Sequence, residues 1–203
     1  MTHSLHRQLT DSGREKDFTV IMLRAMGVNN EGYLPKCQEF LRIAARHNAL
    51  NLSSEMKGNR LLFSLEEIVA DAEGDSQALF GSPEDLTSFL RALRKADLGL
   101  SVTVSGDFDI VDRCFSEAGL KHHSANFSLG IWGKTEALPS PEVLRVTTLC
   151  GHGMVPPKLV ETMVEEIRMG KRTPEDAARV LALPCKCGIF DHELAAELLA
   201  EMA

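Results

Sequence analysis

Two short cysteine motifs in the last third of the chain carry the residue types best suited to chemistry. The first reads Cys-Gly-His-Gly-Met over residues 150–154, and the second reads Pro-Cys-Lys-Cys-Gly over residues 184–188. Each lies between two predicted helices, where a Gly- or Pro-containing loop can turn thiolates and backbone N–H groups inward. The pattern predicts a metal site whose ligands are Cys150, Cys185 and Cys187.

The spacing of these cysteines sets the local structure that the site requires. Cys185 and Cys187 can converge on one ion only from a turn, because residues two apart in a helix point in different directions. Gly188 makes such a turn easier. The stretch from 158 to 183 is long enough for an antiparallel helical hairpin, which would return Cys185 to the neighbourhood of Cys150.

Three cysteines leave a fourth position, for which His152 is the nearest candidate. In a 4Fe-4S cluster the remaining iron could take His152, water or substrate, and an open iron acts as a Lewis acid. Zinc is the alternative, since the three cysteines and His152 make a tetrahedral set. The one-residue gap between Cys185 and Cys187 is tighter than structural zinc loops normally use, which favours the cluster. Copper(I), with Met154 as a soft ligand, ranks third.

A plainer interpretation is that the cysteines are buried thiols with no ligand, as most are in cytosolic proteins. Cys37 and Cys114 fit it, because each lies on or beside the apolar stripe of a predicted helix. We expect both in the core and outside the site. The other three of the five cysteines lie in loops instead, which favours a metal.

A row of small polar side chains forms a second candidate site. It occupies one face of two predicted strands, near 98–105 and 123–131, and few of its neighbours are charged. Such a face predicts a pocket for a small polar substrate, with an exposed face or a polar interface as the alternative. Trp132 and Lys134 follow the second strand, where a ligand could approach and Lys134 could bind an anionic group. The candidate substrate-binding residues are therefore Ser101, Thr103, Ser105, Ser124, Asn126, Ser128, Trp132 and Lys134.

Composition limits the class of protein and its partners. The 203 residues are 44% hydrophobic and 25% charged, as in an ordinary globular protein, and the net charge is −7 without a Lys/Arg cluster. These values argue against nucleic acid or an anionic membrane as partner. No apolar run suggests a signal peptide or a membrane span, so we expect a cytoplasmic protein with reduced thiols. We expect a small-molecule substrate, and a homo-oligomer is compatible with the sequence.

The predicted fold class is α+β, with a ferredoxin-like sheet-and-helix part before an all-helical part that carries the cysteine site. Helix starts are expected at the capping residues Ser64, Ser82, Ser140 and Thr173 and at Pro156-Pro157, and a last helix is expected over 191–202. The predicted strands are 18–25, a hairpin through 52 and 61–63, 98–105 and 123–131. The predicted division is a flexible tail at 1–16, an α+β domain at 17–133 and a helical metal-binding domain at 134–203.

The function that these patterns favour is an oxygen-sensitive iron–sulfur enzyme of lyase, hydratase or desulfurase type. An open iron would bind the substrate, and His152 would be its fourth ligand or an acid–base group. A zinc-stapled module for protein interaction or ligand sensing is the first alternative. An electron-transfer or cluster-carrier protein is the second, and it would require a fully ligated cluster.

Overall fold

The computed structural model describes residues 7, 8 and 13–203 and divides the chain into two compact units. The first, here called the sheet unit, comprises residues 14–123 together with the short segment 186–189. The second, the helical unit, comprises residues 1–13, 124–185 and 190–203. Most of the expected flexible tail at 1–16 lies outside the described residues.

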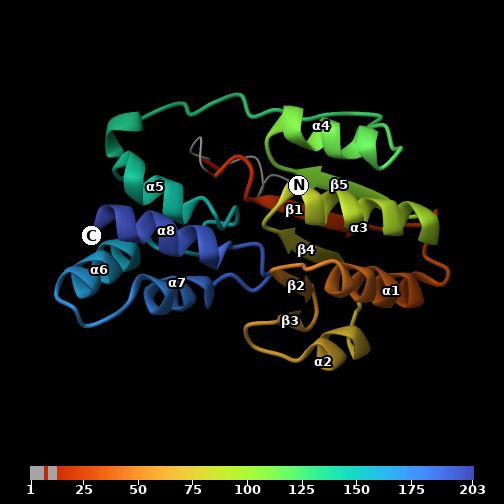
Figure 1. The fold of residues 1–203 in the computed structure, drawn as a ribbon, viewed down its shortest axis with the longest axis horizontal. Coiled ribbons are helices and arrows are strands. Elements are labelled where there is room, and N and C mark those ends of the chain that lie inside the picture. The colour runs from red at the N-terminus through yellow and green to blue at the C-terminus, as the bar shows by residue number, and fades with distance from the viewer. Residues whose placement is uncertain (1–6, 9–12) are drawn as a thin grey trace. The chain divides into compact units, whose positions relative to one another are not determined.

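The sheet unit is built on five antiparallel strands in the order β3-β2-β4-β1-β5 (Figure 1). The strands are β1 (Phe18–Leu23), β2 (Asn51–Ser54), β3 (Gly58–Asn59), β4 (Ser76–Phe80) and β5 (Ser101–Ser105). Because β4 lies between β1 and β2, the connection through the first helix joins two strands that are not neighbours. Helices and an antiparallel sheet thus occur together, and the predicted α+β class is confirmed.

Four helices pack on one face of this sheet and enclose its hydrophobic core. They are α1 (Tyr33–Arg46), α2 (Leu65–Ala70), α3 (Pro83–Ala96) and α4 (Phe108–Glu117). The predicted caps are confirmed: Ser64 and Glu67 form a reciprocal capping box on α2, and the Ser82 side chain caps α3. Cys37 and Cys114 are buried in the core, as expected from their helical stripes.

The two faces of the sheet differ in chemistry because successive strand residues alternate between them. In β1, Phe18, Val20 and Met22 join the helix-covered core. Thr19 and Ile21, which alternate with them, lie on the opposite face of the sheet. The register places Ser53, Gln77, Ile21 and Thr103 in one cross-strand row, and Asn51, Leu79, Thr19 and Ser105 in another. This second side of the sheet, here called the polar sheet face, is also largely buried.

Two strand predictions are wrong. Residues 121–134 form no regular strand: the Trp132 indole Nε1–H donates to the Leu129 carbonyl at 2.8 Å, and Gly130 has φ 93°, which interrupts an extended chain. The hairpin ends after Gly58–Asn59 and does not reach 61–63, because the amides of Leu62 and Phe63 both donate to the Asn59 carbonyl in a turn.

The helical unit contains the short 3-10 helix η1 (Thr135–Ala137) and four α-helices. These are α5 (Pro141–Thr147), α6 (Pro157–Arg168), α7 (Pro174–Ala182) and α8 (His192–Met202). The predicted starts are confirmed: the Ser140 and Thr173 side chains cap α5 and α7, and α6 begins at Pro157. The last helix lies where it was expected, and Asp191 caps it with its side chain. The apolar faces of the four helices pack together as a small bundle.

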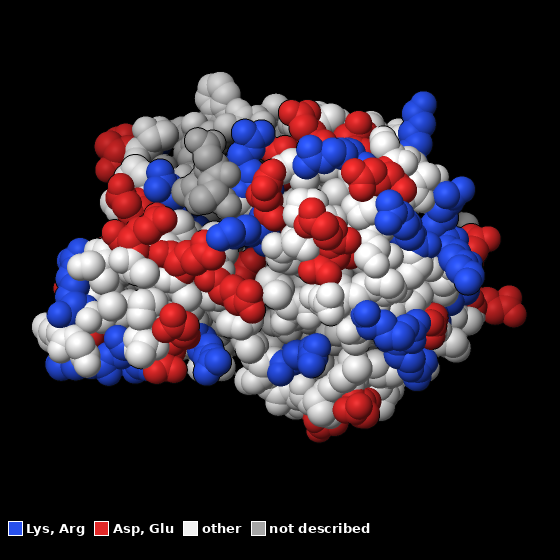
Figure 2. Space-filling model, viewed as in Figure 1, with Lys and Arg blue, Asp and Glu red and all other residues white. Residues whose placement is uncertain are grey.

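The surface carries both signs of charge. Figure 2 shows acidic and basic side chains interspersed on the face that it views. Within the described residues, no helix is both long and apolar enough to cross a membrane.

Candidate metal centre

Cys150 lies in the loop between α5 and α6, at the end of a tight series of turns. Its own amide donates to the Thr147 carbonyl at 3.2 Å, and its carbonyl accepts from the Gly153 amide at 3.0 Å. Gly153 has φ 66°, a left-handed conformation that glycine adopts without strain. The loop folds back on the cysteine, whose side chain is 2% exposed.

Cys185 lies in the corresponding loop after α7. Its amide donates to the Ala182 carbonyl at 3.0 Å, which carries the last helical turn directly into the cysteine. The side chain is 1% exposed. Pro184 precedes it and cannot extend the helix with a hydrogen bond of its own.

The helical unit brings these two cysteines together. A side-chain hydrogen bond joins the thiols of Cys150 and Cys185. The polypeptide between them runs through α6 and α7, which pack against each other. The predicted return of Cys185 to Cys150 by a helical hairpin is therefore confirmed.

Electrostatics in this pair favour a neutral Cys150 thiol when no cation is bound. The hydrogen bond that the Cys150 thiol donates to the Cys185 sulfur, followed by burial, raises the pKa of Cys150 well above its ordinary value. Backbone N–H groups of Met154 and His152 act in the opposite direction, because they donate to the sulfur and stabilise a thiolate. A soft cation bound at the pair would replace the thiol protons, and the same N–H groups would then support the charge on sulfur.

His152 contributes its backbone to this arrangement, and its imidazole is exposed. Met154, the candidate third-ranked copper ligand, is 53% exposed. The role of the His152 side chain as a ligand or as an acid–base group stays a prediction.

Cys187 lies in the 186–189 segment of the sheet unit, where the strands β2 and β3 hold its backbone. Ser53 Oγ donates to the Cys187 carbonyl at 2.5 Å, and Asn59 Nδ2 donates to the Lys186 carbonyl at 3.1 Å. These two side chains therefore bind the peptide groups before and after Cys187. The Cys187 side chain itself is half-buried.

Gly188 permits the close approach of this segment to the hairpin. It has φ 68°, and a Cβ atom added to it would lie 2.6 Å from Asn59 Cβ and 3.1 Å from Asn51 Nδ2. A side chain would therefore be strained by its backbone conformation and would also collide with β3. The predicted turn at Gly188 is present and depends on glycine for both reasons.

The chain also limits how far Cys187 lies from Cys185. Two residues of extended polypeptide span at most about 7 Å, so the Cα atoms of these cysteines are always close. Within residues 7, 8 and 13–203, however, no three His, Cys, Asp or Glu side chains gather closely enough to hold a metal ion. The structure defines a dithiol pair, and the ligand set of Cys150, Cys185, Cys187 and His152 stays a prediction.

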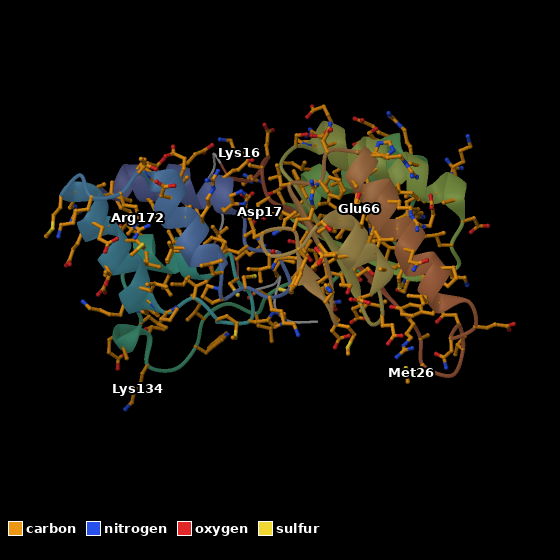
Figure 3. The ribbon with its side chains drawn as sticks, turned by 90° about the horizontal axis from the view of Figure 1, so that it is seen from below. Lys16, Asp17, Met26, Glu66, Lys134 and Arg172 are labelled. Atoms are coloured by element: carbon orange, nitrogen blue, oxygen red, sulfur yellow. The ribbon has the colours of Figure 1, made fainter. Side chains whose placement is uncertain are left out.

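The predicted substrate-binding residues fall into two groups. Ser101, Thr103 and Ser105 lie on β5 in the sheet unit, whereas Ser124 to Lys134 belong to the helical unit. The second group lies on no strand, so the proposed row across two neighbouring strands is wrong. Trp132 is 82% exposed, and Lys134 projects away from the ribbon (Figure 3). Ligand binding by either group stays a prediction.

Sequence reasoning missed the polar residues that surround the Cys187 segment on the polar sheet face. Asn51, Ser53 and Asn59 are each 1% exposed, and Thr19 and Gln77 share this face. The Thr19 Oγ1 and Gln77 Oε1 atoms are buried without a hydrogen-bond partner in the described part of the chain. The available signal was the alternation of Asn51, Leu52 and Ser53, which places amide and hydroxyl groups on one side of a buried strand.

Comparisons of this chain with protein families, with curated proteins and with solved structures find no match.

Proposed function

We propose that the chain is an iron–sulfur protein in which Cys150, Cys185 and Cys187 hold a 4Fe-4S cluster. The observation that carries the proposal is the buried, hydrogen-bonded pair of Cys150 and Cys185, formed by two helix-connecting loops and served by backbone N–H donors. Thiolates are the ligands of such clusters, and N–H donors to sulfur stabilise their negative charge. Cys187 supplies the third thiolate within reach of Cys185.

We propose further that the protein is an oxygen-sensitive enzyme of lyase, hydratase or desulfurase type. A cluster with three cysteine ligands supplies one iron that binds a hydroxyl, carboxylate or sulfur of the substrate as a Lewis acid. With metal bound, the amides of His152 and Met154 would stabilise the negative charge on Cys150, and Ser53 and Asn59 bind the backbone beside Cys187. The imidazole of His152 is the candidate proton carrier, two residues from a ligand.

The polar sheet face supports a small polar molecule as the substrate. Thr103 and Ser105 of β5 share this face with Thr19 and Gln77, whose buried oxygens accept no hydrogen bond from any residue that the structure describes. The segment that carries Cys187 is bound to the same face by Ser53. Substrate hydroxyl or amine groups would satisfy these oxygens, as ligands do in mostly preformed sites.

Zinc is the second candidate, because N–H donors to sulfur and a Cys3His set suit a structural zinc as well. The protein would then be an interaction or ligand-sensing module. A cluster with His152 bound to its fourth position would instead suit electron transfer or cluster delivery.

We also propose that the sheet unit is a ferredoxin-like domain that carries β3 and α2 as an insertion. The order β2-β4-β1-β5, with α1 and α3 as the crossing helices, supports this assignment. The proposed location is the cytoplasm, where thiols remain reduced.

The deciding experiment is purification under anaerobic conditions, followed by analysis of iron, sulfide, zinc and copper. The wild type is expected to contain about four iron and four sulfide per chain. Cys150→Ser, Cys185→Ser and Cys187→Ser are each expected to lose most of this iron. Cys114→Ala, a core cysteine outside the site, is the matched control and should retain it.

Other results would replace the proposal. One zinc per chain without iron would establish the zinc-stapled module. If the wild type retained no metal, even after anaerobic reconstitution with iron and sulfide, the thiol pair would be an ordinary buried contact. Normal iron in Cys187→Ser, with loss in the other two variants, would remove Cys187 from the ligand set.

A further inference from the structure

The strand β5 forms an edge of the sheet that carries no charge. Its five residues read Ser-Val-Thr-Val-Ser, and its single partner among the described strands is β1. Proteins normally protect such edges with lysine, proline or a bulge, because the open edge can bind another strand. The exposed Ser101 and the half-buried remainder of β5 have none of these protections.

The residues 124–129, here called the pairing segment, have the sequence pattern of a strand. Ala125, Phe127 and Leu129 alternate with three polar residues, and the segment contains no charge. Leu129 is 88% exposed and Phe127 is 66% exposed. Exposed apolar side chains in such a run mark surfaces that bind a partner.

The patterns of the pairing segment and of β5 are complementary. In β5, Val102 and Val104 pack against the helix-covered core, whereas Thr103 and Ser105 lie on the polar sheet face. A strand added beside β5 with Phe127 and Leu129 on the core side would extend the apolar layer. Its polar residues would then extend the polar sheet face, so one register satisfies both sides of the sheet.

We propose that the pairing segment of one copy binds the β5 edge of a second copy and that the exchange is reciprocal. Each chain carries both the uncharged β5 edge and the uncharged pairing segment, so a twofold dimer forms two equivalent pairings. Main-chain hydrogen bonds provide affinity in such strand addition, and the alternating side chains provide the register. This proposal does not depend on the identity of the metal.

The test is sedimentation velocity of the wild-type chain over a wide concentration range, together with amide hydrogen exchange. We expect a species of about twice 22.3 kDa. Exchange should slow in both 124–129 and 101–105 as this species forms. Leu129→Lys adds a charge at an exposed position and is expected to raise the dimer dissociation constant at least tenfold, with an unchanged circular dichroism spectrum.

Met169→Lys is the matched control, since Met169 is 64% exposed at the end of α6 and lies outside both elements. It should dimerise as the wild type does. A wild type that stays monomeric at every concentration would overturn the proposal. So would a dimer that Leu129→Lys leaves intact, or a monomer in which 124–129 is already protected by pairing within its own chain.

Discussion

Ser53 donates its hydroxyl hydrogen bond to the carbonyl of Cys187, a residue far along the chain and the proposed third ligand of the metal centre. Asn59 donates to the preceding carbonyl, that of Lys186, so β2 and β3 together bind the two peptide groups on either side of Cys187. The conformation of the Cys-Lys-Cys loop therefore depends on side chains of the sheet as well as on the loop itself.

Removal of this hydroxyl is expected to weaken metal retention. Ser53→Ala loses the hydrogen bond to the Cys187 backbone, and changes to groups that orient ligands commonly reduce metal affinity about tenfold or more. The measurement is the rate at which a chelator removes metal from the reconstituted protein. Ser54→Ala is the control, because the hydroxyl of this neighbour donates instead to the Asp71 carbonyl. Equal rates for the two variants would remove Ser53 from the positioning of the loop.

Substitution of Gly188 is expected to destabilise the protein more than substitution of Gly170. The two glycines have φ values of 68° and 67°, so alanine bears a similar backbone cost of roughly 1–2 kcal/mol at both positions. A Cβ at Gly170 has no atom within 4 Å, whereas one at Gly188 meets Asn59 Cβ. The free energies of unfolding of Gly188→Ala and Gly170→Ala, measured in urea, separate the effect of the steric collision from the cost of the backbone conformation. Similar losses in the two variants would show that the segment moves freely away from β3.

The metal-free protein is expected to lose stability as the pH rises above about 8.5, the ordinary pKa of a cysteine thiol. The pKa of Cys150 is raised in the folded state, so its contribution is present at lower pH and disappears as the unfolded chain releases thiol protons. Burial raises the pKa of Cys37 and Cys114 in the same direction. Unfolding free energies of wild type and Cys150→Ala at about pH 7 and about pH 10 test this. The variant should show the smaller decline, and an equal decline would contradict the assignment to Cys150.

Replacement of Thr19 by valine is expected to stabilise the protein by about 1 kcal/mol, because the buried Oγ1 has no hydrogen-bond partner among the described residues and the shape is retained. Thr147→Val is the control, since the Thr147 hydroxyl donates to the Leu144 carbonyl at 3.3 Å and its loss should not stabilise. Thermal unfolding measures both. A less stable Thr19→Val protein would instead indicate that a bound water or ligand uses this oxygen.

Local signals in the sequence predicted most helices correctly. Ser64 with Glu67, Ser82 with Pro83 and Thr173 all start helices because their side chains satisfy backbone N–H groups within the next turn. Such caps involve neighbours in the chain and can therefore be recognised without tertiary information.

The incorrect strand at 123–131 shows where local signals are insufficient. The alternation of Phe127, Leu129 and Ile131 is typical of a strand, but a strand also requires a partner strand. In the described structure, a turn at Gly130 and Trp132 takes the place of hydrogen bonds to such a partner. Pairing between strands depends on tertiary structure, which the pattern within one segment cannot specify.

The sequence could predict only the part of the candidate site that depends on elements close together in the chain. The meeting of Cys150 and Cys185 follows from a helical hairpin whose length can be read from the sequence. The hydrogen bonds from Ser53 and Asn59 to residues 186–187, by contrast, connect segments that are far apart in the sequence. Only the folded structure could reveal it.

The segment 186–189 belongs to the sheet unit although the residues on either side of it belong to the helical unit. A cut after His123 would therefore divide the polypeptide without giving two self-sufficient products. The fragment 14–123 would lack the four residues that its hairpin binds, and the fragment 124–203 would carry them as an unbound loop. Two such fragments, produced together, should recognise each other by complementation.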